Sequence, residues 1–279
     1  MMYSKQHLER VRKLAYKHIG ITLGPNKDAM ISNRLDKLRD TLNNNNVEEL
    51  LNSIEQGEYI DTFVATLTTN KTNFFRESYH FDDLRDRIAS HVQNNNESLS
   101  IYCAAASTGE EPYSIIMTLE HAKELHDNPM FKYSLLASDI DTSVLATCKK
   151  GIYEWEKSAM DFPSWVTPEK YFKRRENTSR PGDYLIKVKD SLRKKVEFGK
   201  MNLMSAKYPF REAQFDVVFC RNVLIYFNQE DQLSILKKLF STLKIGGTLY
   251  LGHAESPLEL VPYIERLGHN IFVKTKHYL

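Results

Sequence analysis

Cysteine is scarce in this sequence, and no cysteine has a partner at a spacing typical of a disulfide framework or a zinc site. The chain has three cysteines among its 279 residues, and Cys103, Cys148 and Cys220 stand far apart. Widely spaced single cysteines are typical of proteins kept in a reducing compartment. The sequence therefore predicts a protein without disulfides and without a bound metal.

Long hydrophobic runs are also missing. No segment approaches the roughly 20 consecutive apolar residues that span a bilayer. The N-terminal stretch, MMYSKQHLERVRKLAYKH, is polar and lacks the apolar centre of a secretion signal. These absences predict a cytoplasmic protein that does not insert into a membrane.

A strong excess of one charge and several catalytic motifs are absent as well. The net charge of +2 is too small to predict a nucleic-acid-binding protein, because phosphate binders concentrate many Lys and Arg side chains on one surface. No HExxH, GxSxG, GxGxxG or GxxxxGK pattern occurs, which counts against zinc proteases, serine hydrolases, NAD enzymes and P-loop triphosphatases. What is present, 42% apolar and 27% charged residues, is ordinary for a globular protein.

The first part of the sequence, from residue 4 to about 75, has a helical pattern. Apolar residues recur there every three or four positions, as in Leu8, Val11, Ala15 and Ile19 and again in Ile31, Leu35, Leu38 and Leu42. Gly24-Pro25 and the polar tract 43–46 interrupt the pattern, and no strand is evident. The sequence predicts a small helical N-terminal domain.

From residue 99 onward, short β-prone runs alternate with helical patterns. The runs cover 99–103, 134–139, 215–219 and 248–251, and helices are expected from about 112, near 142–149 and near 229–243. Such alternation is typical of an α/β fold, with a mostly parallel sheet covered by helices on both faces. Residues 271–278 are expected to add a final strand as an antiparallel edge.

An irregular insert at about 151–200 separates the second and third of these strands. It contains two β-prone runs, 184–189 and 195–198, and a turn signal at Pro181-Gly182. We interpret the insert as a small antiparallel β excursion. The alternative is a surface loop, although so long a connection without secondary structure is unusual in a compact domain.

The segment AAASTGEEPY, residues 104–113, joins the first strand to a helix at the edge of the sheet where open α/β sheets bind ligands. Its small residues let a ligand approach the backbone, Gly109 can adopt a positive φ, and Pro112 suits the first turn of a helix. The alternative is a capping box between Thr108 and Glu111. Two adjacent carboxylates disfavour a bound pyrophosphate and favour a cationic or hydroxyl-rich ligand.

Two further strand ends carry polar side chains. Asp139 ends the second strand, where a carboxylate can accept hydrogen bonds from both ribose hydroxyls, whereas Asp141 suits the N-cap of the following helix. The segment FDVVFCRNVLIYF, residues 215–227, leaves Arg221, Asn222 and Tyr226 at or just past the end of its strand. A surface ion pair for Arg221 and core packing for Tyr226 are the alternatives. A structural role is expected for His253, which also follows a strand.

Four separated motifs together resemble the CheR chemotaxis receptor methyltransferases: NKTNFFR at 70–76, AAASTGEEPYS at 104–114, ASDID at 137–141 and FCRNVLIYF at 219–227. The resemblance covers nearly the whole chain, in order. It implies a Rossmann-like domain that uses S-adenosyl-L-methionine to methylate glutamate side chains on chemoreceptor helices. It also implies a helical domain at 1–76 and a catalytic domain at 77–279 with an inserted β-subdomain at about 170–198.

The resemblance also implies roles for individual residues. It assigns Asn70, Thr72 and Arg76 to the cofactor pocket, Glu111 to the methionine or neighbouring cofactor groups and Asp139 to the ribose. It places Asn202 and Leu203 near the adenine, completes the pocket with Arg221 and Asn222, and makes Arg76 and Tyr226 candidates for contacting the reacting region. A glycine-rich GxGxG, present in many methyltransferases, is replaced here by AAASTG.

Partners are implied in the same way. Lys27, Arg34 and Lys37 lie on one flank of a predicted helix at 27–42 and Arg39 on the other, so either a solvated flank or docking of acidic receptor helices is expected. The β excursion, with its turn at 180–183, is a candidate site for a receptor's C-terminal peptide by strand addition. A non-catalytic adaptor that keeps the cofactor is the rival function, and a dehydrogenase is disfavoured by the carboxylates beside Gly109.

Overall fold

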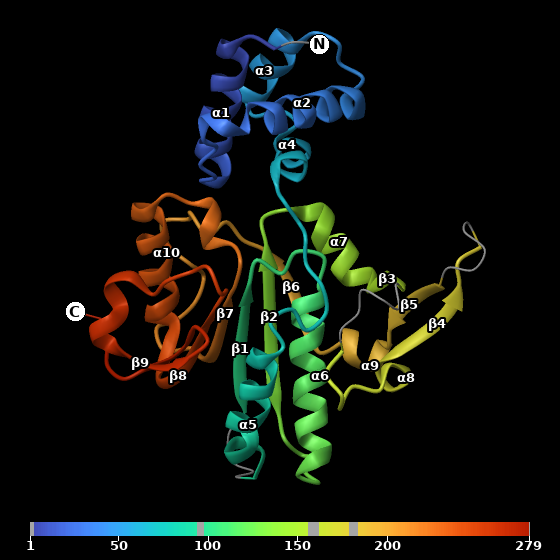
Figure 1. Ribbon diagram of the computed structural model, residues 1–279, viewed down its shortest axis with the longest axis vertical. Coiled ribbons are helices and arrows are strands. Elements are labelled where there is room, and N and C mark those ends of the chain that lie inside the picture. Colours follow the sequence, from blue (N-terminus) through green and yellow to red (C-terminus); the bar gives the residue numbers. More distant parts are fainter. Residues whose placement is uncertain (1–2, 94–97, 156–161, 179–183, 279) are drawn as a thin grey trace.

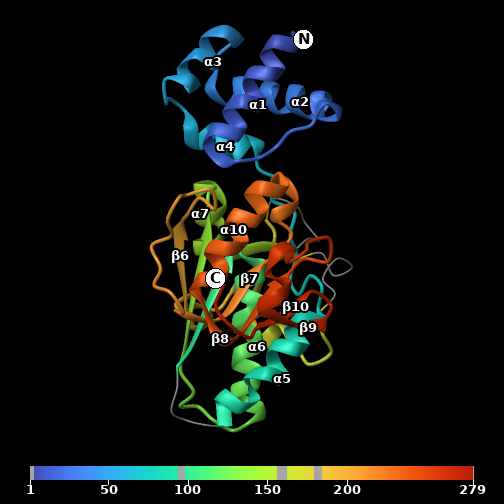
Figure 2. The same ribbon diagram turned by 90° about the vertical axis from the view of Figure 1, so that its left-hand side faces the viewer.

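A computed structural model describes residues 3–93, 98–155, 162–178 and 184–278. The N-terminal part is a bundle of short helices that stands at one end of the molecule, above the sheet (Figures 1 and 2). Its helices are α1 (Lys5–Ile19), α2 (Asp28–Leu42), α3 (Val47–Glu55) and α4 (Ile60–Leu67). The predicted helical pattern is confirmed for these elements, but it was wrong for residues 68–75, which form a non-helical linker.

The buried apolar stripe of each helix meets the others in one core that includes Leu8, Ile31, Leu50 and Phe63. Capping explains where two of the helices begin. Ser4 and His7 form a reciprocal capping box at α1, and Asn46 accepts hydrogen bonds from the first turn of α3.

Two of the basic residues of α2 are part of this structure and do not form a solvated flank. The guanidinium of Arg34 donates hydrogen bonds to the carbonyl oxygens of Thr66 and Thr68 at the end of α4. Arg39 is 9% exposed and donates to the carbonyl oxygens of residues 44 and 45. Only Lys27 and Lys37 of the predicted flank are exposed.

The larger part is built on a seven-stranded sheet with the order β6-β2-β1-β7-β8-β10-β9. Its strands are β1 (Leu99–Ala104), β2 (Tyr133–Asp139), β6 (Val196–Lys200), β7 (Phe215–Cys220), β8 (Leu243–Leu251), β9 (Ile264–Gly268) and β10 (Ile271–Lys274). Strands β6, β2, β1, β7 and β8 run parallel, and β10 and β9 are antiparallel. The predicted mostly parallel sheet is therefore confirmed.

Alternate residues of the central strands face two different cores. Ile101 and Cys103 of β1 join a cluster with α5 (Tyr79–Gln93) and α6 (Glu110–Leu125), whereas Tyr102 and Ala104 join a cluster with α10 (Gln229–Thr242). The shorter α7 (Thr142–Lys150) packs beside β2 and β6. Because both faces are covered, the central strands are mostly apolar on both sides, with few polar residues such as Ser100 and Asp216.

Two details of the sheet differ from the prediction. The run at 195–198 belongs to the main sheet as β6, because it pairs in parallel with β2, and it is not part of the antiparallel excursion. Strand β10 is antiparallel as predicted but is not the edge, because β9 pairs on its outer side. Both differences arise from hydrogen bonding between strands, which the local sequence pattern does not encode.

The insert forms a separate three-stranded antiparallel sheet with the order β3-β5-β4. Its strands are β3 (Ile152–Trp155), β4 (Phe172–Glu176) and β5 (Tyr184–Val188), accompanied by α8 (Pro168–Tyr171) and α9 (Asp190–Arg193). The antiparallel excursion thus exists, and its first strand begins at Ile152. The predicted turn at Pro181-Gly182 lies outside the described residues, and strand addition by a receptor peptide stays a prediction.

The linker between α4 and α5 crosses the carboxyl ends of the parallel strands. Thr68 and Asn70 donate side-chain hydrogen bonds of 2.9 and 3.0 Å to Asp141, and the backbone N–H of Phe75 donates to Ser114 Oγ at 2.9 Å. The buried rings of Phe74 and Phe75 pack into the core beneath the linker. The linker is therefore held against the sheet at several points.

The helical bundle also contacts the sheet part directly. The backbone N–H of Thr22 donates to the carbonyl oxygen of Tyr226 at 2.9 Å, and Asn202 Nδ2 donates to the carbonyl oxygen of His18 at 2.9 Å. Gly20 has φ +72° and packs so closely that an added Cβ would lie 2.4 Å from Met204 Cγ. Within the described ranges, the structure contains no helix that is both long and apolar enough to cross a membrane.

Candidate cofactor and active site

A cavity of about 450 Å³ lies where the carboxyl ends of β1, β2 and β7 meet the linker and the helical bundle. It is lined by every residue that the sequence singled out for the site: Asn70, Thr72, Arg76, Glu111, Asp139, Asn202, Leu203, Arg221, Asn222 and Tyr226. Ile19 and Ile21 of the bundle complete the wall. The structure therefore brings together residues that are more than 150 positions apart in the chain.

Asp139 is 8% exposed and ends β2 at the cavity. Its two carboxylate oxygens accept backbone hydrogen bonds from Ser107 at 2.8 Å and from Asp141 at 3.0 Å. Burial raises its pKa and these N–H donors oppose the shift. Asp141 accepts from the N–H groups of residues 143 and 144 and is the N-cap of α7, as the sequence predicted.

Glu111 faces the cavity from the first turn of α6. The capping-box alternative was wrong, since Gly109 occupies the N-cap with φ +103° and no side-chain cap bond, and Thr108 donates to Glu110 at 2.6 Å. Glu111 Oε2 lies 2.8 Å from Arg221 Nη1, and Oε1 accepts from Cys103 Sγ at 3.3 Å. Burial raises the pKa of Glu111, and the guanidinium of Arg221 acts against that increase.

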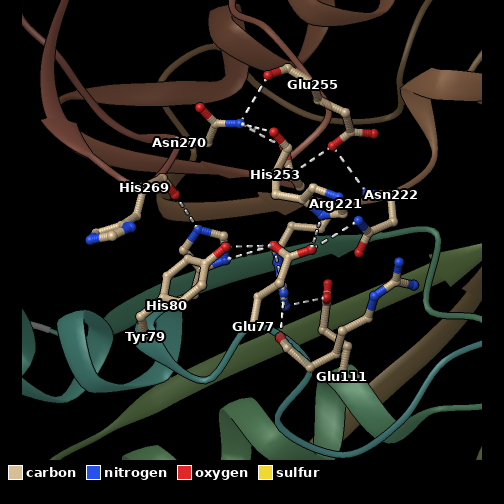
Figure 3. Close-up of polar contacts among 12 residues, drawn as sticks. Glu77, Tyr79, His80, Glu111, Arg221, Asn222, His253, Glu255, His269 and Asn270 are labelled. Carbon is tan, nitrogen blue, oxygen red and sulfur yellow. Dashed lines mark hydrogen bonds and ion pairs between the residues drawn. The ribbon is translucent and has the colours of Figure 1, made fainter.

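Arg221 lies between two carboxylates and is not a surface ion pair (Figure 3). Its side chain is fully buried, with Nη1 near Glu111 and Nη2 at 3.2 Å from Glu77 Oε2. Nη2 also donates to the backbone carbonyl of Arg76. Burying one guanidinium is tolerated here because its charge is balanced from both sides.

Glu77 was missed by the sequence reasoning. It accepts from Asn222 Nδ2 at 3.1 Å and lies 3.0 Å from His253 Nδ1, in addition to the contact with Arg221. Burial works against its charged form, but Arg221 and the hydrogen bonds from His253 and Asn222 prevail and lower its pKa to about 2. His253 is largely exposed and supports Glu77, in line with the structural role expected for it.

Glu255 is a second residue that the sequence did not reveal. It is 8% exposed, and its carboxylate accepts from the backbone N–H groups of Asn222 at 3.0 Å, Val223 at 2.8 Å, Leu224 at 2.7 Å and Gly252 at 2.6 Å. Asn270 Nδ2 in turn donates to the backbone carbonyl of Glu255 at 2.9 Å (Figure 3). This carboxylate therefore holds the loop that carries Asn222 and Tyr226. An acidic residue four positions after a strand end was its only sequence signal.

Several segments around the cavity have an unusual backbone conformation. Non-glycine residues with positive φ occur in the linker (Phe75 and Glu77), in the loop after β1 (Ala105 and Ser107) and after β7 (Asn222). Such conformations cost about 1–3 kcal/mol each and persist where surrounding contacts enforce them. Here buried acceptors bind the N–H groups of Phe75, Ser107 and Asn222.

Arg76 and Tyr226 differ from the polar groups described above, whose hydrogen-bond partners lie within the protein. Arg76 is half-buried, and its guanidinium donates only to the carbonyl oxygen of Lys71 at 3.2 Å, without an ion pair to any residue that the structure describes. Tyr226 lies on the short η2 helix (Leu224–Tyr226), and its hydroxyl makes no hydrogen bond within the described residues. Both side chains line the cavity with donors available.

Comparison with known proteins agrees with this geometry. Residues 70–268 match the family described as CheR methyltransferase, SAM binding domain, and residues 6–68 match the CheR methyltransferase, all-alpha domain. The chain belongs to the CheR methyltransferase family. It uses S-adenosyl-L-methionine as methyl donor and acts as a methyltransferase in chemotaxis.

Curated members of the CheR family resemble the chain over nearly its whole length. The chemotaxis protein methyltransferase of Escherichia coli (strain K12) is 36% identical, covering 98% of this chain and 92% of that protein. The protein of the same name from Borreliella burgdorferi is 35% identical, covering 91% of this chain and 89% of that protein. Chemotaxis protein methyltransferase 2 of Pseudomonas aeruginosa is 34% identical over 97% of this chain and 93% of that protein.

The cavity of this CheR protein fits the methyl donor chemically. Apolar side chains, among them Ile140, Leu203, Val223 and Phe227, line part of the wall and suit an adenine ring, while Asp139 offers a carboxylate at the end of β2. In the described residues, no group of three or more His, Cys, Asp or Glu side chains is arranged to hold a metal ion.

Proposed function

We propose that this protein transfers the methyl group of S-adenosylmethionine to glutamate side chains on the cytoplasmic helices of chemoreceptors. The products are glutamate methyl esters and S-adenosylhomocysteine, and the reaction serves sensory adaptation. The observation that carries the proposal is Arg76, a guanidinium at the cavity wall without a carboxylate partner in the described structure. A substrate carboxylate would supply that partner.

In this proposal the cavity residues divide between donor and acceptor. Asp139 accepts from the ribose hydroxyls, and Asn202 and Leu203 lie beside the adenine. Asn70, Thr72 and Glu111 act at the methionine end, and Arg221 with Asn222 closes the pocket. Arg76, which also contributes to the cofactor pocket, and Tyr226 bind the glutamate carboxylate that accepts the methyl group. Their common position on the cavity supports this division.

The chemistry requires positioning more than proton transfer. A glutamate side chain with a pKa of about 4.3 is ionised at neutral pH, so its oxygen can accept the methyl group without a general base. The residues must align the carboxylate with the methyl group and remove part of its water shell. Arg76 and Tyr226 can do both, because each offers a donor that replaces water at the carboxylate.

Methyl transfer to a receptor fragment tests the proposal. Incubation of the full chain with S-adenosylmethionine labelled in its methyl group should put label on chemoreceptor cytoplasmic fragments, and mild base should release it, as expected for a methyl ester. Fragments whose acceptor glutamates are replaced by alanine should stay unlabelled. Binding of the donor without any transfer would support the rival function of a non-catalytic adaptor.

The helical part is proposed to dock the receptor, with residues 1–76 as the docking unit and 77–279 as the catalytic unit. Support comes from Lys27 and Lys37, which are exposed, whereas Arg34 and Arg39 are engaged within the bundle. Exposed cations suit acidic receptor helices.

Reversing the charge of both exposed lysines, Lys27→Glu with Lys37→Glu, should raise KM for a receptor fragment about tenfold at low salt. The dissociation constant of S-adenosylmethionine should not change, because neither lysine lines the cavity. Lys13→Glu with Lys17→Glu, on exposed positions of α1, makes the same change in charge and is the control. An equal rise of KM in both double variants would contradict docking at α2.

A further inference from the structure

The loop between β1 and α6 lines the cavity with Ala105 and Ser107. These two residues have φ values of +59° and +49°, and Gly109 at the end of the loop has +103°. Non-glycine residues keep such conformations where surrounding contacts enforce them, so the loop depends on its neighbours for its shape. That shape reaches the donor site directly, because the backbone N–H of Ser107 donates to Asp139 Oδ2 at 2.8 Å.

Part of the support for this loop comes from the inserted three-stranded sheet, which lies beside α6 and α7 (Figure 1). Tyr153 on β3 is 8% exposed, and its hydroxyl donates to the carbonyl oxygen of Thr108 at 2.9 Å. The hydroxyl can approach so closely because Gly109 has no side chain, since an added Cβ there would lie 2.9 Å from the hydroxyl oxygen. This hydrogen bond therefore joins the insert to the wall of the cavity.

The ring of Tyr153 also contacts the linker that carries Arg76. Its centroid lies 5.0 Å from that of Phe74, with the two rings at 82° to each other. Phe74 in turn packs edge-on against Phe172 of β4, with 5.2 Å between the ring centroids. One tyrosine of the insert thus touches both the loop and the linker at the cavity.

Other contacts hold the loop from different sides. Cys148 Sγ of α7 donates to the carbonyl oxygen of Ser107 at 3.1 Å, and Ser107 Oγ donates to the carbonyl oxygen of Asn70 at 3.1 Å. These contacts would remain if the hydroxyl of Tyr153 were removed. Its removal should therefore loosen the loop near Thr108 without unfolding the protein.

We propose that Tyr153 is a positioning residue for the methyl donor. Its hydroxyl holds the Thr108 carbonyl, so that the Ser107 N–H stays in place to orient Asp139 and the loop keeps its form at the cavity. The insert thereby contributes to donor binding, a role separate from strand addition by a receptor peptide. This inference rests on the proposed placement of the donor beside Asp139.

Removing one oxygen atom, in Tyr153→Phe, tests the inference. The dissociation constant of S-adenosylmethionine, measured by titration calorimetry of the full chain, should rise about fivefold. KM for the donor should rise by a similar factor, while kcat at saturating donor should stay within about twofold, because the hydroxyl does not contact the reacting atoms. Tyr171→Phe is the matched control, since the buried hydroxyl of Tyr171 in the same insert has no hydrogen-bond partner among the described residues. It should change none of these quantities.

Amide hydrogen exchange of the protein without ligand distinguishes positioning from general stability. In Tyr153→Phe the N–H groups of Ser107 and Gly109 should exchange faster, whereas those of β1 and β5 should not. An unchanged dissociation constant, or exchange that rises equally throughout the insert, would overturn the inference. Loss of folding in Tyr153→Phe would overturn it too, because the hydroxyl would then support the whole insert. Failure of the unaltered chain to bind S-adenosylmethionine would instead refute the proposed donor site.

Discussion

Replacing Arg221 by methionine should lower the free energy of unfolding by about 3–5 kcal/mol, measured by urea denaturation. The physical reason is that Glu77 and Glu111 would remain buried without the guanidinium that balances them. Arg221→Lys keeps a charge but not the planar donor arrangement, so its loss should be smaller. Lys200→Met, which removes an exposed ion pair with Asp61, should cost at most about 1 kcal/mol.

The loss caused by Arg221→Met should also depend on pH. In the unaltered protein the pKa of Glu77 is about 2, below its ordinary value, so its stabilising contribution is present above about pH 4.5 and is lost as the pH falls toward 2. Without Arg221, burial raises the pKa of the Glu77 and Glu111 carboxyls. The variant then becomes less stable as the pH rises above the ordinary pKa of a glutamate side chain. The difference in the free energy of unfolding between the unaltered protein and Arg221→Met should therefore shrink as the pH falls from 7 to about 3. A difference independent of pH would contradict the central role of this ion-pair cluster.

Replacing Arg76 by methionine should lower turnover with receptor fragments about a hundredfold, because one charged donor to the reacting carboxylate is lost. Unlike Arg221, Arg76 has no ion pair within the described residues, so its removal leaves no buried charge behind. The thermal unfolding temperature should therefore change little. S-adenosylmethionine should bind more weakly, because Arg76 also lines the donor cavity, but saturation with the donor should not restore turnover. Single-turnover methylation measures the loss of methyl transfer, and titration calorimetry measures the binding of S-adenosylmethionine separately.

Two companion variants complete that test. Arg76→Lys should recover part of the turnover, since it keeps the charge without the paired donors. Tyr226→Phe removes one hydroxyl donor and should lower turnover about tenfold while donor binding persists. Unchanged turnover in Tyr226→Phe would remove the hydroxyl from the mechanism, and a loss of folding in Arg76→Met would mean that this guanidinium is structural.

The residues at the strand ends could be predicted because of a general property of parallel sheets. Asp139 ends one strand and Arg221 follows another, and parallel neighbours place their carboxyl ends at the same edge. The segment 104–114 added the first turn of α6, whereas the linker residues 70–76 and Asn202 with Leu203 came only from the resemblance to the CheR family. Local sequence was sufficient for Glu111, Asp139 and Arg221, because each lies within a few residues of an element that the hydrophobic pattern identifies.

The supporting residues could not be predicted in this way. Glu77 and Glu255 contact partners 145 and 31–33 positions away in the chain, at separations that no local pattern encodes. Arg34 resembled a solvent-exposed cation on its helix, yet it donates to the end of α4. The run 195–198 has strand character in isolation, but hydrogen bonding to β2 assigns it to the main sheet.

By itself, the sequence determined the helical N-terminal part, the alternating strands and helices, and the residues that face the cavity. These follow from periodicity, turn chemistry and motif identity, all of which act over short stretches of chain. Only the tertiary structure decided which charges neutralise one another and that Arg76 has no ion pair among the described residues. That outcome depends on distances between Arg221, Glu77 and Glu111, and folding alone brings these side chains together.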